Sequence, residues 1–115
     1  MKVIKIDAVP EYWLGEKKNS MRRIKEVFQC KNMKIHVGIF PPKAQSSRHI
    51  HENSEEIVYV VTGVGEVEAG GETASFGPNT MVYIEAAVPH LYRNLGDEEM
   101  MTFAVYSPPV ELPRK

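Results

Sequence analysis

Short apolar segments separated by turn-forming residues fill the second half of the chain, and none is long enough for a typical helix. The run Ile-Val-Tyr-Val-Val at 57–61 is β-branched and aromatic, which is typical of a strand. Gly70–Gly71 stands between two such segments and predicts a tight hairpin. The predicted strands cover residues 33–40, 56–62, 65–69, 72–76, 80–84, 91–94 and 100–106. This pattern predicts an all-β fold.

The first forty residues are less regular. The segment 21–28 fits both a helical stripe and an alternating pattern, and we favour a strand. In the strand at 33–40, His36 shares a face with Lys34, so His36 is predicted to face solvent. Residues 8–20 are expected to form an irregular lead-in, in which Tyr12 and Trp13 cover a sheet edge or a subunit contact. The proline-containing tail at 107–115 is expected to be extended.

Composition limits the class of protein. A chain of 115 residues with 43% hydrophobic residues has the size and core content of one domain, covering 1–115. The formal net charge is −1 and no basic stripe is present, which disfavours a nucleic-acid partner. No apolar run approaches the roughly 20 residues needed to cross a membrane. The single cysteine, Cys30, cannot form a disulfide within the chain, and no signal peptide is recognisable. We therefore expect a cytoplasmic protein with no membrane partner.

Three of the four histidines and one glutamate form the pattern that carries chemistry. His49 and His51 are two residues apart, so on an extended segment both imidazoles point to the same face. Glu55 and Glu56 follow, and because they are adjacent only one can point inward; periodicity does not decide which. His90 lies far along the chain, but a barrel can bring distant strands together. Imidazoles and a carboxylate are typical ligands of a transition metal.

The stretch from 41 to 94 resembles the cupin superfamily. Its first motif is similar to a glycine, a spacer, His-x-His, three or four residues, Glu, six residues and Gly. This chain has His-Ile-His at 49–51, then Glu56 and Gly63 at that spacing, which selects Glu56 over Glu55. The second motif is similar to Gly, five residues, Pro-x-Gly, two residues, His, three residues and Asn. Here His90 and Asn94 stand at the last two positions.

Other motif positions differ. The glycine before the first motif falls near Lys43, and Asn79, Glu85 and Ala87 stand where the second motif has Gly, Pro and Gly. Asn79 can adopt a positive φ nearly as a turn glycine does. Glu85 and Ala87 affect the shape of the turn before His90 rather than the ligand itself. The resemblance implies a single-domain jelly-roll barrel, a double-stranded β-helix.

The resemblance also implies one divalent transition metal ion, which is Fe, Mn, Ni, Co or Zn. The expected ligands are His49, His51, Glu56 and His90. Residues of matching parity are candidate contacts for a small-molecule ligand in an adjoining pocket: Gln45, Ser47, Tyr92 and Asn94.

Three functions are compatible with these residues. The first is a small metalloenzyme acting on an oxygen-rich molecule, because cupins of this build include dioxygenases, decarboxylases, lyases and isomerases. The second is a non-enzymatic module that binds or senses a sugar or small acid. The third, disfavoured by the intact ligand set, is a jelly roll that has lost its metal and resembles epimerases. We also expect a homodimer in which a strand at 2–6 pairs with the partner's sheet edge.

Overall fold

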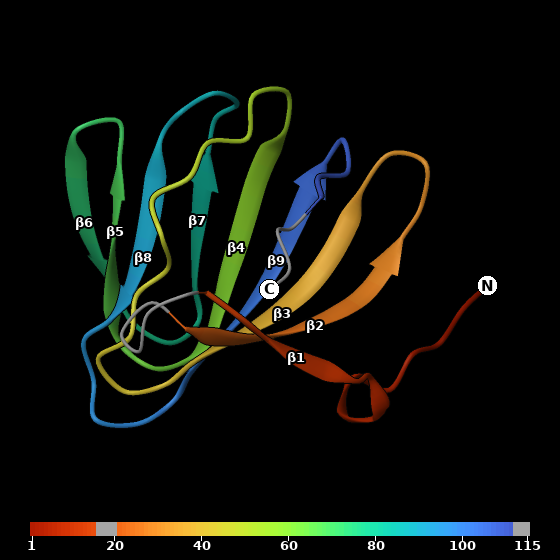
Figure 1. The fold of residues 1–115 in the computed structure, drawn as a ribbon, viewed down its shortest axis with the longest axis horizontal. Helices are drawn as coiled ribbons and strands as arrows, with labels where there is room; N and C mark the ends of the chain where they lie inside the picture. The colour runs from red at the N-terminus through yellow and green to blue at the C-terminus, as the bar shows by residue number, and fades with distance from the viewer. Residues whose placement is uncertain (16–20, 112–115) are drawn as a thin grey trace.

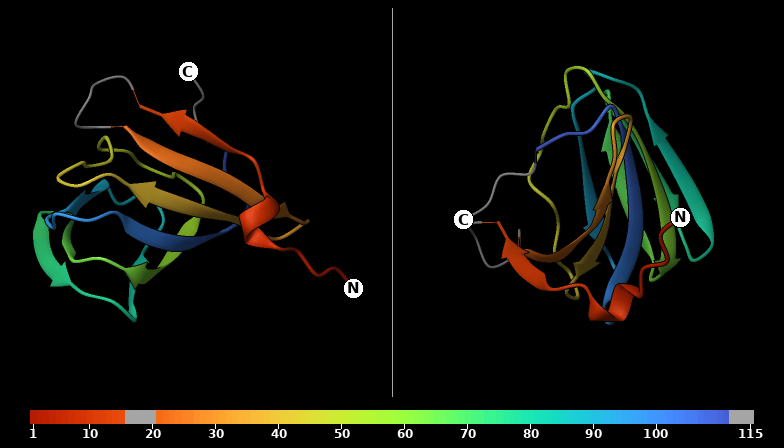
Figure 2. Two further views of the ribbon diagram at one scale, coloured as in Figure 1. Left: turned by 90° about the horizontal axis from the view of Figure 1, so that it is seen from below. Right: turned by 90° about the vertical axis from the view of Figure 1, so that its right-hand side faces the viewer.

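Two antiparallel sheets face each other in the computed structural model, which describes residues 1–15 and 21–111 (Figures 1 and 2). The larger sheet has six strands in the order β1-β2-β3-β9-β4-β7, and the smaller has three in the order β6-β5-β8. The elements are η1 (Ile6–Ala8), a 3₁₀ helix, and the strands β1 (Glu11–Leu14), β2 (Arg22–Gln29), β3 (Lys34–Phe40), β4 (Glu55–Thr62), β5 (Gly65–Ala69), β6 (Glu72–Phe76), β7 (Thr80–Ile84), β8 (His90–Asn94) and β9 (Met100–Ser107). The predicted all-β fold is confirmed.

Strands far apart in sequence become neighbours. β9 lies between β3 and β4 and pairs with both, so Tyr106 is opposite Lys34 on one side and opposite Glu56 on the other. The pairing brings the second half of the chain back onto the first.

β5 and β6 form the predicted hairpin, in which Gly70 and Gly71 both have positive φ values, of 58° and 84°. Positive φ values at both turn residues give the turn a twist that matches the twist of the flanking strands.

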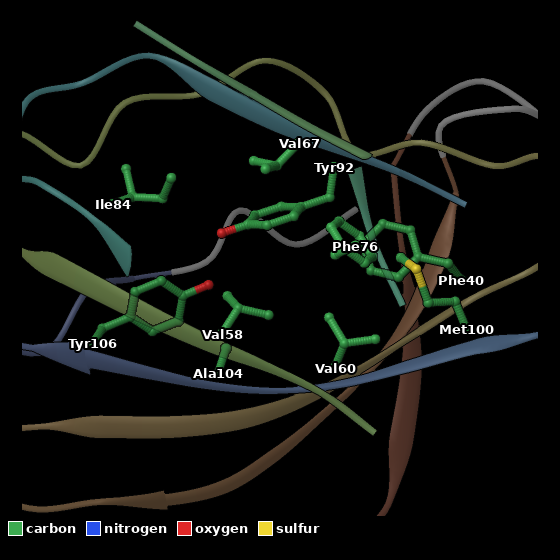
Figure 3. Close-up of a cluster of buried hydrophobic side chains, with 10 residues drawn as sticks. All are labelled: Phe40, Val58, Val60, Val67, Phe76, Ile84, Tyr92, Met100, Ala104 and Tyr106. Atoms are coloured by element: carbon green, nitrogen blue, oxygen red, sulfur yellow. The ribbon is translucent and has the colours of Figure 1, made fainter. Parts of the chain in front are cut away.

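The hydrophobic core fills the space between the sheets (Figure 3). Inward-facing residues of β4 alternate with outward-facing ones, so Val58 and Val60 are buried while Ile57 and Tyr59 are exposed. Tyr92 from β8 and Tyr106 from β9 both extend into this interior (Figure 3). One end of the interior is therefore apolar, and tyrosine hydroxyls bring polarity to the rest.

One prediction about the N-terminal region is wrong and another stays a prediction. Residues 1–5 form no strand within the single chain, and the expected pairing of residues 2–6 with a partner's sheet edge stays a prediction. The lead-in at 8–20, expected to be irregular, contains β1, which pairs with β2 at the edge of the larger sheet. Trp13 lies on this edge strand and remains half-exposed. Part of the predicted lead-in, residues 16–20, and the end of the predicted tail, residues 112–115, lie outside the described residues.

The predicted orientation of His36 is also wrong. His36 is only 4% exposed, and Lys34 on the same face is equally buried. The prediction took the polar face of β3 as the outer one. In the structure that face points into the barrel, because the interior contains polar and charged side chains as well as a core. Among the described residues, no helix is long and apolar enough to cross a membrane.

Candidate metal centre

The four candidate ligands come from three parts of the fold. His49 and His51 lie in the connection between β3 and β4, Glu56 is the second residue of β4, and His90 begins β8. The backbones of His49 and His90 exchange two hydrogen bonds of 3.0 Å, which tie the connection to the smaller sheet. Ala87 N–H donates to the His51 carbonyl oxygen at 2.9 Å, so the turn before His90 holds the second histidine in place.

These side chains converge on one point. One ligand atom from each of His49, His51, Glu56 and His90 can be chosen so that all four lie within 4.8 Å of one another. Neighbouring Glu55 points outward, where its Oε1 accepts a hydrogen bond of 2.5 Å from the Tyr83 hydroxyl. The structure therefore places Glu56, and not Glu55, with the histidines.

Backbone carbonyls orient two of the imidazoles. The Nδ1 atoms of His49 and His90 lie 2.7 Å from the Ser47 carbonyl oxygen and 2.9 Å from the Val88 carbonyl oxygen. Each carbonyl can only accept, so each Nδ1 carries the proton, and Nε2 of the neutral ring carries a lone pair. This arrangement of an outer carbonyl behind a histidine is common at metal ligands.

Glu56 is the electrostatic centre of the site. Burial alone would raise its pKa, but His51, His90 and the Tyr92 hydroxyl, 2.5 Å from its Oε2, hold the pKa well below the usual range. Burial lowers the pKa of His90, but the adjacent Glu56 carboxylate outweighs burial and leaves that pKa raised. Where His90 gains a second proton, at Nε2, that positive charge lies beside Glu56, and a bound metal ion would take its place.

Burial lowers the pKa of His49 to about 4, and the charge of His90 adds to this effect. His49 is therefore neutral at pH 7, which is the form that binds a metal.

The residues present fit a metal ion. His51 Nε2 is buried and lies 3.3 Å from Glu56 Oε1, but it makes no hydrogen bond within the described residues. His90 Nε2 lies 3.2 Å from the same oxygen. Where these imidazoles are neutral, their Nε2 lone pairs repel the carboxylate unless a proton or a metal ion lies between them. Three imidazoles and one carboxylate suit Fe(II), Mn(II), Ni(II), Co(II) or Zn(II).

A narrow cavity adjoins this cluster. Its lining residues come from β2, β3, β4, β8, β9 and the connection after β3, and they are Arg22, His36, Gly38, Phe40, Ser46, His49, Glu56, Val58, Tyr92, Thr102, Ala104 and Tyr106. Of the four residues predicted to contact a ligand, only Tyr92 lines this cavity.

The other three serve the scaffold or face outward. Gln45 accepts a hydrogen bond from Arg93 at the surface, and Ser47 is exposed. Asn94 is buried, but its Nδ2 donates to backbone carbonyls, including that of Phe40 at 3.1 Å. Parity did not find the inward side chains at Gln45 and Ser47 because the connection at 41–54 is not a regular strand, whereas Asn94 does point inward from β8.

Several cavity residues were missed by the sequence reasoning. Ser46, adjacent to the predicted Ser47, is buried, and its Oγ accepts from the Tyr92 N–H at 3.0 Å. Arg22 and Tyr106 were not singled out, and His36 was predicted to face solvent. One signal could have found two of them: Arg22 and His36 share parity with Ile24 and Phe40, which are buried.

Comparison with known families gives the class of protein. Residues 36–106 match the Cupin_2 family, described as a cupin domain, and this match covers more than half of the chain. The chain belongs to the cupin superfamily as a Cupin_2 protein. The predicted family is therefore confirmed, and the matched residues contain all four candidate ligands.

Similar sequences include named enzymes. The polyketide synthase CurC of Streptomyces cyaneus is 41% identical over 63 residues, which cover 55% of this chain and 41% of that protein. The L-ectoine synthase of Vibrio atlanticus (strain LGP32) is 32% identical over 107 residues, which cover 84% of each protein. The chain spans half or less of the length of the first such relatives, those from Streptomyces cyaneus and Aliivibrio fischeri.

Solved structures share the fold. A predicted oxalate decarboxylase from Thermotoga maritima has a TM-score of 0.85 at 16% identity, over 93% of this chain and 99% of that one. The polyketide cyclase RemF from Streptomyces resistomycificus has a TM-score of 0.80 at 19% identity, over 99% and 82%. An RmlC-like cupin from Shewanella frigidimarina has a TM-score of 0.74 at 15% identity, over 89% and 86%. These likenesses show the jelly-roll fold.

Proposed function

We propose that this protein is a metal-dependent cupin enzyme that binds one divalent transition metal ion and acts on a small, oxygen-rich molecule. The observation that carries the proposal is the convergence of three imidazoles on the buried Glu56, where His51 Nε2 has no hydrogen-bond partner among the described residues. His49, His51, Glu56 and His90 would hold the ion. When bound, the ion would polarise an oxygen of the substrate or acidify a bound water.

The chain's own residues would position the ligand. The Tyr92 hydroxyl is committed to Glu56 and would keep that carboxylate oriented. Val58 and Ala104 line the cavity with small apolar groups, which exclude water from the reacting atoms. Support for an enzyme rather than a binding module comes from the named relatives, which include a synthase of L-ectoine and a polyketide synthase.

Adjacent glutamates provide a matched test of the metal site. Elemental analysis of the purified or metal-repleted protein is expected to give close to one transition metal ion per chain. Glu56→Gln should lower metal affinity by about tenfold or more, since it removes an anionic ligand. Glu55→Gln, which changes the outward neighbour, should leave affinity unchanged. A wild-type protein without metal after repletion, or equal effects of the two substitutions, would contradict the proposal.

Turnover distinguishes an enzyme from a binding module. The metal-loaded protein is incubated with a library of small organic acids and sugars, and each mixture is followed by mass spectrometry. An enzyme consumes one compound, and Glu56→Gln abolishes that loss. Retention of a compound without chemical change would instead favour the sensing module.

We further propose a homodimer formed through the outer face of the larger sheet. Met81 and Tyr83 on the edge strand β7, and Ile57 and Tyr59 on β4, are exposed apolar or aromatic residues on adjoining strands. Exposed apolar patches of this kind commonly mark interfaces. Met81→Lys is expected to convert the dimer to a monomer in light scattering, and a wild-type monomer at micromolar concentration would contradict the proposal. The cytoplasmic location stays a prediction, as does the lack of a nucleic-acid partner.

A further inference from the structure

Arg22 is a buried cation inside the barrel. It is the first residue of β2, is 8% exposed, and lines the same cavity as His49 and Glu56. Its guanidinium carbon lies 5.7 Å from the centroid of the Phe40 ring, which supports one face of the planar group. Such a position fixes the plane of the guanidinium and leaves its N–H groups available at the edge.

The neighbouring arginine shows what a paired guanidinium looks like in this fold. Arg23 lies on the opposite face of β2 and forms salt bridges with Glu11 at 3.1 Å and Glu99 at 2.8 Å. Within the described part of the chain, no carboxylate forms a salt bridge with Arg22. An arginine buried without a carboxylate is costly, and burial accordingly lowers the pKa of Arg22. A buried charge that destabilises the fold in this way is kept when the charge has a function, such as binding a ligand.

The balance of charges inside the barrel indicates what kind of group would pair with Arg22. Lys34 is buried and pairs with Glu26 at 2.6 Å, so these two cancel. Glu56 attracts Arg22 across the cavity, and these two also balance. Once a divalent ion is bound, its two positive charges have no counterpart among these groups, and the Glu56 carboxylate is drawn to the ion. A ligand entering this cavity is therefore favoured if it is an anion.

We propose that Arg22 anchors a carboxylate of the molecule that occupies the metal centre, so that the substrate is a small carboxylic acid. This inference rests on the proposed function and narrows its substrate class. A carboxylate offers two oxygens to the guanidinium fork, which forms short, charge-assisted hydrogen bonds with that shape. Of the neighbouring hydroxyls, Thr102 Oγ1 donates to the Gly38 carbonyl oxygen, and Ser46 Oγ, which accepts from the Tyr92 N–H, is a neutral and therefore weaker donor than a guanidinium. Arg22 is thus the strong donor that faces the cavity without a carboxylate partner.

The test compares propionate with propionamide, which has nearly the same shape but no charge. Binding of each to the metal-loaded protein is measured by calorimetry or NMR titration. Arg22→Gln is expected to weaken propionate binding by about tenfold or more, as befits a charge-assisted pair, and to leave propionamide binding unchanged. Arg22→Lys should retain part of the affinity. Arg23→Gln, on the outer face, is the matched control and should have no effect.

Metal content separates this inference from the function on which it rests. If Arg22→Gln keeps its metal and binds propionate as the wild type does, Arg22 is not the anchor, and the metal centre stands. Failure of the wild type to bind propionate at tens of millimolar also overturns the inference. If the wild type holds no metal, the proposed function fails, and the same titration on the metal-free protein decides the role of Arg22. Loss of folding in both Arg22 variants would assign it a structural role and overturn the inference.

Discussion

Acid should destabilise this protein through His36, which is buried in the barrel without a charge partner. Burial lowers its pKa to about 3, and the charge of Arg22 adds to this effect. The folded state therefore keeps His36 neutral, whereas the unfolded chain binds a proton below pH 6.5. Because the unfolded state binds more protons between pH 6.5 and 3, the free energy of unfolding falls as the pH falls through this window.

The magnitude follows from the pKa difference. Each pH unit inside the window costs about 1.4 kcal/mol for one proton, so His36 alone should remove about 2 kcal/mol between neutral pH and pH 5. His36→Gln places a neutral amide in the same space and should abolish this contribution. Its stability at neutral pH can be lower, since the contact of 3.4 Å with the Tyr106 hydroxyl changes. The slope, and not the absolute stability, is the measured quantity.

Urea denaturation of metal-free protein at several pH values measures that slope. The other titrating groups act equally in both proteins, so the difference between wild type and His36→Gln isolates one residue. As the pH falls, we expect the free energy of unfolding of His36→Gln to decrease less steeply than that of the wild type. The difference between the two slopes should be about 1.4 kcal/mol per pH unit inside the window. Parallel pH profiles for the two proteins would refute the reasoning, because they would mean that His36 is protonated as readily in the folded state as in the unfolded chain.

Three further outcomes follow from the geometry. Ala87 has a φ of 65°, where the cupin motif has glycine, so Ala87→Gly should raise the free energy of unfolding by about 1 kcal/mol in urea titrations. A lower free energy of unfolding for Ala87→Gly than for the wild type would contradict the inferred backbone strain at Ala87. Gly63→Ala should destabilise by about 3 kcal/mol or more, because φ is +100° and a Cβ would lie 2.7 Å from the Met100 Cβ; an unchanged melting temperature would count against it. Metal affinity, titrated against pH, should fall as the pH falls, because the raised pKa of His90 makes its proton a strong competitor for the site; full affinity at pH 5 would rule out ligation by His90.

Local sequence pattern was sufficient for most of the strands. Runs such as Glu55–Thr62 and Met100–Ser107 are β-branched or aromatic and end at turn residues, so their type depends little on distant contacts. The candidate metal ligands could also be predicted, because motif spacing selected Glu56 over Glu55 and singled out three of the four histidines. Asn79 adopts the positive φ that was expected of it, at 61°.

The polar interior could be recognised only in three dimensions. Periodicity divides β3 into two faces, but it does not say which face points inward when both carry side chains that end up buried. His36 and Lys34 were assigned to solvent because polar residues are usually exposed. Their true surroundings come from β2 and β9, which pair with β3 from distant parts of the chain and close the cavity around it.

Strand content, turns and the identity of the candidate ligands could be predicted without a structure, because each depends on residue type and short spacing. Only the three-dimensional contacts show that Ser46 and not Ser47 meets the cavity, that Asn94 ties backbone segments together, and that Arg22 lines the cavity without a salt bridge to any carboxylate of the described residues. The physical reason is that burial and charge pairing are properties of contacts between distant segments, and strand pairing sets which segments meet.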